Sequence, residues 1–76
     1  MYYFITELQT RPDGIVNTSI ITRSSLALGL SYYYQRASVA VSTVDFKAVA
    51  LTLQDQNGVI IENKCFDTCY EEPVAS

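Results

Sequence analysis

The polar residues with the clearest capacity to bind a ligand form one short stretch, Thr22-Arg23-Ser24-Ser25, directly ahead of an apolar segment. Serine hydroxyls in this position commonly cap a helix, and the unpaired N–H groups and dipole of a helix start attract anions. Arg23 would add a positive charge. The stretch therefore predicts either a plain helix cap with Arg23 in solvent or a site for a phosphate or similar anion.

Tyr32 and Arg36 are a second candidate for ligand contact. The run Tyr32–Tyr34 spans too wide an arc of a helix for all three rings to be buried, so at least one should lie at an edge or in an interface. Arg36 follows Tyr32 by four residues and shares its helical face, where the two could stack on and charge-pair with a nucleotide. The alternative is ordinary surface. The predicted ligand site comprises Arg23, Ser24, Ser25, Tyr32 and Arg36.

Groups suited to catalysis or metal binding are scarce. The chain has no histidine, so the usual general base is missing. The close carboxylates Asp67, Glu71 and Glu72 lie where nothing rigid would hold them. Cys65 and Cys69 would need two more zinc ligands, and they are better explained as reduced thiols, with a local disulfide as the alternative. We predict a protein that is not an enzyme and holds no metal or cofactor.

Composition narrows the class of protein. The 76 residues suit one domain, and 49% hydrophobic against 17% charged residues excludes disorder. A net charge of -3 with singly scattered basic residues argues against binding a nucleic-acid polymer. No apolar run approaches the roughly 20 residues that span a bilayer, and the amino terminus lacks a signal-peptide pattern. We expect a soluble, cytoplasmic protein without a membrane partner.

The elements that would position these residues are four strands and one helix. Alternating and β-branched residues predict strands at 2–9, 15–22, 45–54 and 59–66. Turns at 11–14 and 55–58 close two hairpins, because Pro12-Asp13-Gly14 and Asn57-Gly58 favour reversals. The helix should begin at Ser24 or Ser25 and end near Val41, where β-branched residues weaken it.

One helical stripe should face the sheet. Its members recur at spacings of four and three: Leu26, Leu30, Tyr33, Ala37 and Ala40. Gly29 and the small residues nearby would let the two layers approach closely. The predicted fold class is α+β, with β-β-α-β-β order, in which two antiparallel hairpins form one sheet and the helix packs on one face. Residues 1–70 form the single domain, and residues 71–76 form a frayed acidic tail.

An uncovered sheet face follows from having only one helix. That face must hold some of Tyr3, Ile5, Ile20 or Ile21, and Ile60 or Ile61. A second copy of the chain would bury this apolar area at about 25 cal/mol per Å². We therefore predict a homodimer or a higher closed oligomer.

The segments Tyr33–Ser42, Phe46–Leu51 and Gly58–Phe66 resemble a family of small uncharacterised proteins from phages and prophages of Firmicutes. Those proteins have a strand hairpin, a helix with Tyr-His and an alanine-rich end, and a final hairpin with Gly-x-Val and an aromatic close. This chain departs from them at Tyr34 and at Phe46-Lys47, where the family tends to have histidine. The resemblance implies a phage origin, and hence the cytoplasm of an infected or lysogenic bacterium, but no activity.

These features together favour binding over turnover. The leading hypothesis is a non-enzymatic, oligomeric, phage-type protein that counters host defence. It would bind a host protein or sequester a small phosphorylated signal, such as a nucleotide, at oligomer interfaces. The alternative hypothesis is a structural or assembly accessory protein of a phage particle.

Overall fold

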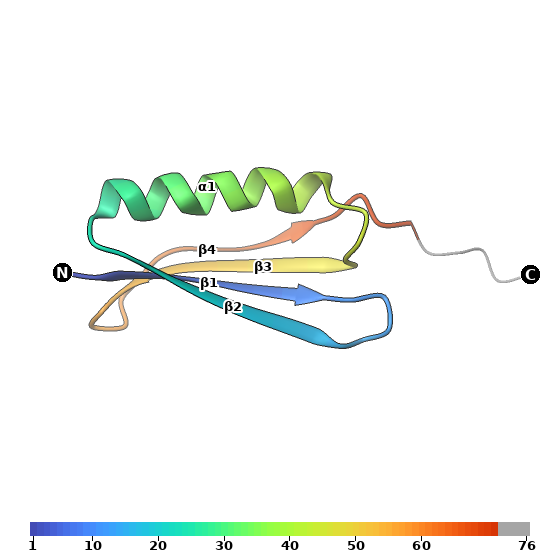
Figure 1. Ribbon diagram of the computed structural model, residues 1–76, viewed down its shortest axis with the longest axis horizontal. Coiled ribbons are helices and arrows are strands. Elements are labelled where there is room, and N and C mark those ends of the chain that lie inside the picture. The colour runs from blue at the N-terminus through green and yellow to red at the C-terminus, as the bar shows by residue number, and fades with distance from the viewer. Residues whose placement is uncertain (72–76) are drawn as a thin grey trace, which may run out of the picture.

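The structure is a computed structural model that describes residues 1–71. Residues 72–76, which make up most of the predicted acidic tail, lie outside the described residues. The described residues form four strands and one helix (Figure 1): β1 Tyr3–Thr10, β2 Val16–Arg23, α1 Leu26–Ser42, β3 Ala48–Asp55 and β4 Ile60–Asp67. Each predicted boundary differs from the observed one by at most three residues, so the predicted element order is confirmed.

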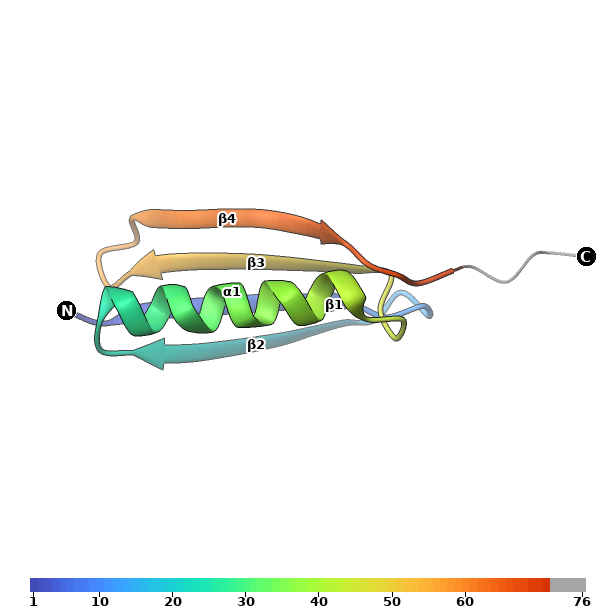
Figure 2. The same cartoon turned by 90° about the horizontal axis from the view of Figure 1, so that it is seen from above.

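The four strands form a single antiparallel sheet in the order β2-β1-β3-β4. The first strand of each hairpin therefore lies at the centre of the sheet, and the second strand lies at an edge. The helix α1 runs along the strands over one face of the sheet (Figures 1 and 2). This arrangement confirms the predicted α+β fold, with one helix on one side of one sheet.

Two glycines close the hairpins as predicted. Gly14 and Gly58 have positive φ angles of 89° and 85°, which residues with a Cβ rarely adopt. The Gly14 N–H donates to the Arg11 carbonyl at 2.9 Å, and the Gly58 N–H donates to the Asp55 carbonyl at 3.1 Å. Both turns thus satisfy backbone groups while they reverse the chain.

The core lies between α1 and the covered face of the sheet. Alternation along β3 places Val49, Leu51 and Leu53 under the helix, and each is at most 2% exposed. The helix contributes Gly29, Tyr33, Ala37 and Ala40 as its buried residues. Most of the predicted stripe is confirmed, but Leu26 is exposed because it occupies the first helical position.

Gly29 marks the closest approach of the helix to the sheet. A Cβ atom at this position would lie 3.3 Å from Leu53 Cδ1 and 3.5 Å from Tyr3 Cβ. The first distance is shorter than ordinary van der Waals contact. The predicted role of Gly29 in close packing is therefore confirmed.

The prediction for the uncovered face is partly wrong. Tyr3 and Ile5 share the covered face with Glu7, and Ile5 is only 1% exposed. The strand has branched or aromatic residues on both sides, so alternation alone does not say which side the helix covers. Ile20 and Ile60 do lie uncovered, at 62% and 56% exposure.

The segment after β4 is tied to the connection between α1 and β3. The Thr68 hydroxyl donates to the Phe46 carbonyl at 2.6 Å, and the Cys69 N–H donates to the Thr43 carbonyl at 2.8 Å. These hydrogen bonds attach the chain beyond the last strand to the end of the helix.

Candidate functional site

Three of the five residues predicted to bind an anion, Arg23, Ser24 and Ser25, lie directly before α1. Ser25 has an extended backbone and is the N-cap, and its hydroxyl accepts from the Leu28 N–H at 3.2 Å. Ser24 precedes it and is exposed. Capping by a serine is therefore confirmed, and it occupies the Ser25 hydroxyl with the helix itself.

Arg23 ends β2 beside the same helix start. Its guanidinium carbon lies 4.8 Å from the centre of the Tyr32 ring, a cation-π contact. One guanidinium nitrogen, Nη1, also donates to the Thr22 carbonyl at 3.0 Å. Arg23 and Tyr32 thus come together at the corner where the cap lies.

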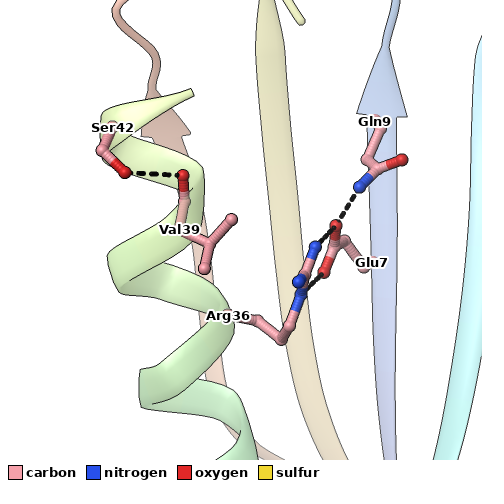
Figure 3. A network of polar contacts seen from close by, with 5 residues as sticks. All are labelled: Glu7, Gln9, Arg36, Val39 and Ser42. Atoms are coloured by element: carbon pink, nitrogen blue, oxygen red, sulfur yellow. Dashed lines mark hydrogen bonds and ion pairs between the residues drawn. The ribbon is translucent and has the colours of Figure 1, made fainter. Parts of the chain in front are cut away.

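Arg36 binds a carboxylate within the protein. Its Nε donates to Glu7 Oε1 at 2.7 Å and its Nη2 donates to Glu7 Oε2 at 2.9 Å, which makes a two-pronged ion pair between α1 and β1 (Figure 3). Gln9 Nε2 donates to the same carboxylate. The main donors of the Arg36 fork are therefore directed at Glu7 instead of at a ligand beside Tyr32.

Burial makes this pair unusual for so small a domain. The Glu7 side chain is 6% exposed and the Arg36 side chain is 30% exposed. The hydrogen bonds from Arg36 lower the pKa of Glu7 against the opposing effect of burial, and the charge of Arg36 and the bond from Gln9 add to the lowering. Glu7 also raises the pKa of Arg36. The pair therefore stays ionised at neutral pH, with its charges cancelled internally.

The Glu7–Arg36 pair was not predicted from the sequence, although two signals point to it. Alternation places Glu7 on the same side of its strand as Ile5, and helical spacing places Arg36 next to the buried Ala37. A carboxylate under a helix needs a cation, because an unpaired buried charge is costly. Once Ile5 is assigned to the covered face, Arg36 is the one basic residue of α1 that can supply this cation.

The tyrosine run divides as predicted. Tyr33 is 2% exposed and belongs to the core, whereas Tyr34 is 56% exposed. Their rings meet edge to face, with centres 5.4 Å apart. Burial raises the pKa of Tyr33, with further contributions from Glu62 and Tyr34. Tyr33 therefore has a packing role, and Tyr34 is the ring available for contact.

The two cysteines are separate, exposed free thiols. Cys65 lies in β4, and the Cys69 thiol donates to the Val41 carbonyl at 3.0 Å. Residues 1–71 contain no group of three His, Cys, Asp or Glu side chains arranged to hold a metal ion, and they enclose no pocket. Within the same residues, no helix is long and apolar enough to cross a bilayer.

The side of the sheet opposite α1 is a further candidate surface, and we call it the open face. Strand register and alternation assign it these residues: Phe4, Thr6, Leu8, Thr10, Val16, Thr18, Ile20, Thr22, Ala48, Ala50, Thr52, Gln54, Ile60, Asn63, Cys65 and Asp67. Only Asp67, at one end, is charged. The open face is thus uncharged across the rest of all four strands.

The chain matched no known protein family, no curated protein and no solved structure. The resemblance to small phage proteins therefore remains a prediction.

Proposed function

We propose that the protein is a non-enzymatic binding protein that acts through its open face. The observation that carries this proposal is the chemistry of that face, where exposed Leu8, Val16, Ile20 and Ile60 lie among threonines and alanines. A sheet face that meets water is ordinarily rich in polar and charged residues. Leu8 lies diagonally opposite both Val16 and Ile20 on this face, and such a cluster of exposed apolar side chains marks sites of protein interaction.

A protein partner with its own uncharged surface suits the open face best. The centres of protein interfaces are depleted in charged residues, as the open face is. Its threonine side chains, among them Thr6, Thr18 and Thr52, combine a methyl group with a hydroxyl and can contact apolar and polar atoms of a partner. Under the proposed phage origin, this partner would be a host protein in the bacterial cytoplasm.

Sequestration of a nucleotide is less well supported than protein binding. Arg36 is bound to Glu7, so the five-residue ligand site predicted from the sequence loses one of its two cations. Ser25 is engaged as the cap, and Arg23 lies over Tyr32. What remains for an anion is Arg23 and the exposed Ser24.

A site-specific photocrosslinker tests the proposal directly. Placed at Thr52, in the middle of the open face, it should form a crosslink to one defined protein when the chain is expressed in a bacterial host. The same group at Gln35, exposed on α1, is the matched control and should not capture that protein. Absence of a Thr52 adduct, or the same adduct from both positions, would contradict the proposal.

Two further outcomes separate the alternatives. Crosslinking of Thr52 to a virion protein that co-purifies with particles would favour a structural or assembly role. A thermal shift with an adenine nucleotide that disappears in Arg23→Ala would restore the nucleotide hypothesis. With protein binding as the function, nucleotides should leave the melting temperature unchanged.

A further inference from the structure

The two edges of the sheet differ in how well they are protected from pairing. In β4, a β-bulge interrupts the register near Gln54, and Glu62 and Lys64 place charges along the strand. In β2, the register with β1 is unbroken over all eight residues. The strand contains no proline, glycine or lysine, and its one charged residue is the terminal Arg23. Natural proteins normally blunt an edge by such devices, so β2 is an edge open to strand addition.

Two hydrogen bonds show which backbone groups of β2 point away from β1. The Arg11 N–H donates to the Ile15 carbonyl within the hairpin, and the Lys47 N–H donates to the Thr10 carbonyl from the β3 side. Thr10 faces Val16 across the hairpin. Because antiparallel strands alternate between bonded and non-bonded pairs, the N–H and C=O groups of Val16, Thr18, Ile20 and Thr22 point away from β1.

We propose that two copies of the chain join through their β2 strands into one continuous antiparallel sheet. A two-fold axis perpendicular to the sheet and passing beside Ser19 pairs Thr18 with Ile20 and Val16 with Thr22 of the second copy. In this register every outward N–H and C=O group of these residues meets a partner. The Thr22 carbonyl, which accepts from Arg23 Nη1, would accept the Val16 N–H of the second copy with its other lone pair. No other element of the described chain lies beyond β2 at this edge (Figure 2).

The side chains of β2 suit self-pairing. The pairs on the open face are β-branched on both strands, which is favourable across an antiparallel ladder. On the other face, Ser19 meets Ser19 and Asn17 meets Ile21. Arg23, the one charge in the strand, lies opposite Ile15 and not opposite another arginine. A second copy therefore fits this edge without like charges in contact.

The symmetry has a consequence for the open face. A two-fold axis perpendicular to the sheet leaves both helices on one side and both open faces on the other. The paired copies would present one uncharged surface twice as wide as that of the single chain. Only the binding of a partner to this joined surface rests on the proposed function. The pairing itself depends on β2 alone.

Sedimentation equilibrium of the wild type and two proline variants tests the pairing. The wild type should have twice the 8.5 kDa mass of the chain. Thr18→Pro removes an outward N–H without removing a bond to β1, and proline is tolerated at such edge positions. The variant should weaken dimerisation by about 30-fold or more, since each dimer loses two hydrogen bonds. Asn63→Pro is the control, because alternation points the Asn63 N–H away from β3, and it should remain dimeric.

Residue-resolved hydrogen exchange gives a readout that needs no variant. The amides of Thr18 and Ile20 should be protected at high protein concentration and should lose protection on dilution. A monomeric wild type, unprotected amides at these positions, or equal dissociation of both proline variants would overturn the pairing. A monomer that still crosslinks a partner from Thr52 would overturn this inference alone, and a dimer without that crosslink would overturn the proposed function alone.

Discussion

The two faces of the sheet are built from the same strands and differ sharply in chemistry. Along β3, Leu51 and Leu53 are completely buried under α1, while Thr52 between them faces the open side. The covered face buries large aliphatic side chains under the helix at its centre, namely Ile5, Val49, Leu51 and Leu53. The open face consists mainly of threonine, alanine and exposed isoleucine. The comparison shows that one side holds the fold together and leaves the other free for contact.

Charge is distributed in the reverse of the usual order. The buried side carries the Glu7–Arg36 ion pair, whereas the open face carries a charge only at Asp67. A sheet face exposed to water would ordinarily show the opposite arrangement. Glu7 and Arg36 neutralise each other under the helix, and the open side is left with few of the charges that oppose association.

Substitution of adjacent residues on β3 should give the largest contrast between the faces. Leu51→Ala leaves a cavity in the core and should lower the free energy of unfolding by about 2–5 kcal/mol. Thr52→Ala removes only partly exposed atoms on the open face and should change it by about 0.5 kcal/mol. Urea unfolding of both variants measures the difference. Equal losses would show that the open face is as important to the fold as the core.

Removing Arg36 should have the next largest effect. Arg36→Ala leaves the Glu7 carboxylate buried without its cation, which should cost about 3 kcal/mol, the lower end for a buried pair because part of the Arg36 side chain meets solvent. Arg23→Ala, which removes the exposed contact with Tyr32, should cost only about 0.5–1 kcal/mol.

The double variant Glu7→Leu with Arg36→Leu is the control for that prediction. Replacing both ends of a buried pair by apolar groups is often neutral or stabilising, so most of the loss should be recovered. Urea unfolding of the wild type, Arg36→Ala and the double variant measures both changes. If the double variant is as unstable as Arg36→Ala, then the loss of stability comes from the lost packing of the Arg36 side chain and not from the unpaired charge of Glu7.

Acid should produce the smallest and most specific effect. Because the pKa of Glu7 is lower in the folded chain than its ordinary value of 4.5, the unfolded chain takes up the proton first as pH falls. The contribution of Glu7 to stability is therefore fully present above pH 4.5 and is lost as pH falls through the folded pKa. Urea midpoints measured between neutral pH and pH 3 should fall less steeply in Glu7→Gln. An unchanged slope would contradict this assignment.

Local signals predicted most of the fold. The alternation of Val49, Leu51 and Leu53 with smaller residues predicted a strand, and Gly14 and Gly58 predicted the hairpin turns. The covered side of β1 could not be assigned in the same way, because Phe4 and Ile5 are both large and apolar. Strand order was equally out of reach, since the pairing of β1 with β3 joins distant parts of the chain.

In the candidate site, too, features set by near neighbours were predicted and a contact between distant residues was not. Capping by a serine and exposure of at least one ring of the tyrosine run depend on neighbours within one turn of helix, and both were predicted. The Glu7–Arg36 pair joins residues 29 positions apart and exists only once α1 lies over β1. Its formation diverted Arg36 from the ligand site that helical spacing alone had suggested.

The position of Glu7 also settles an ambiguity in assembly. Both hairpins are made of two eight-residue strands, so by length alone either could take either place beneath the helix. Beneath the helix, β1 offers the Glu7 carboxylate to Arg36, whereas β3 presents Val49, Leu51 and Leu53. The one acidic residue of β3, Asp55, lies at the end of the strand and accepts hydrogen bonds from backbone N–H groups of the turn. A slip of β1 by one residue would turn the Glu7 carboxylate to the open face and leave Arg36 without its ion-pair partner. Glu7 thus distinguishes the first hairpin from the second, because only the first can form this ion pair with the helix.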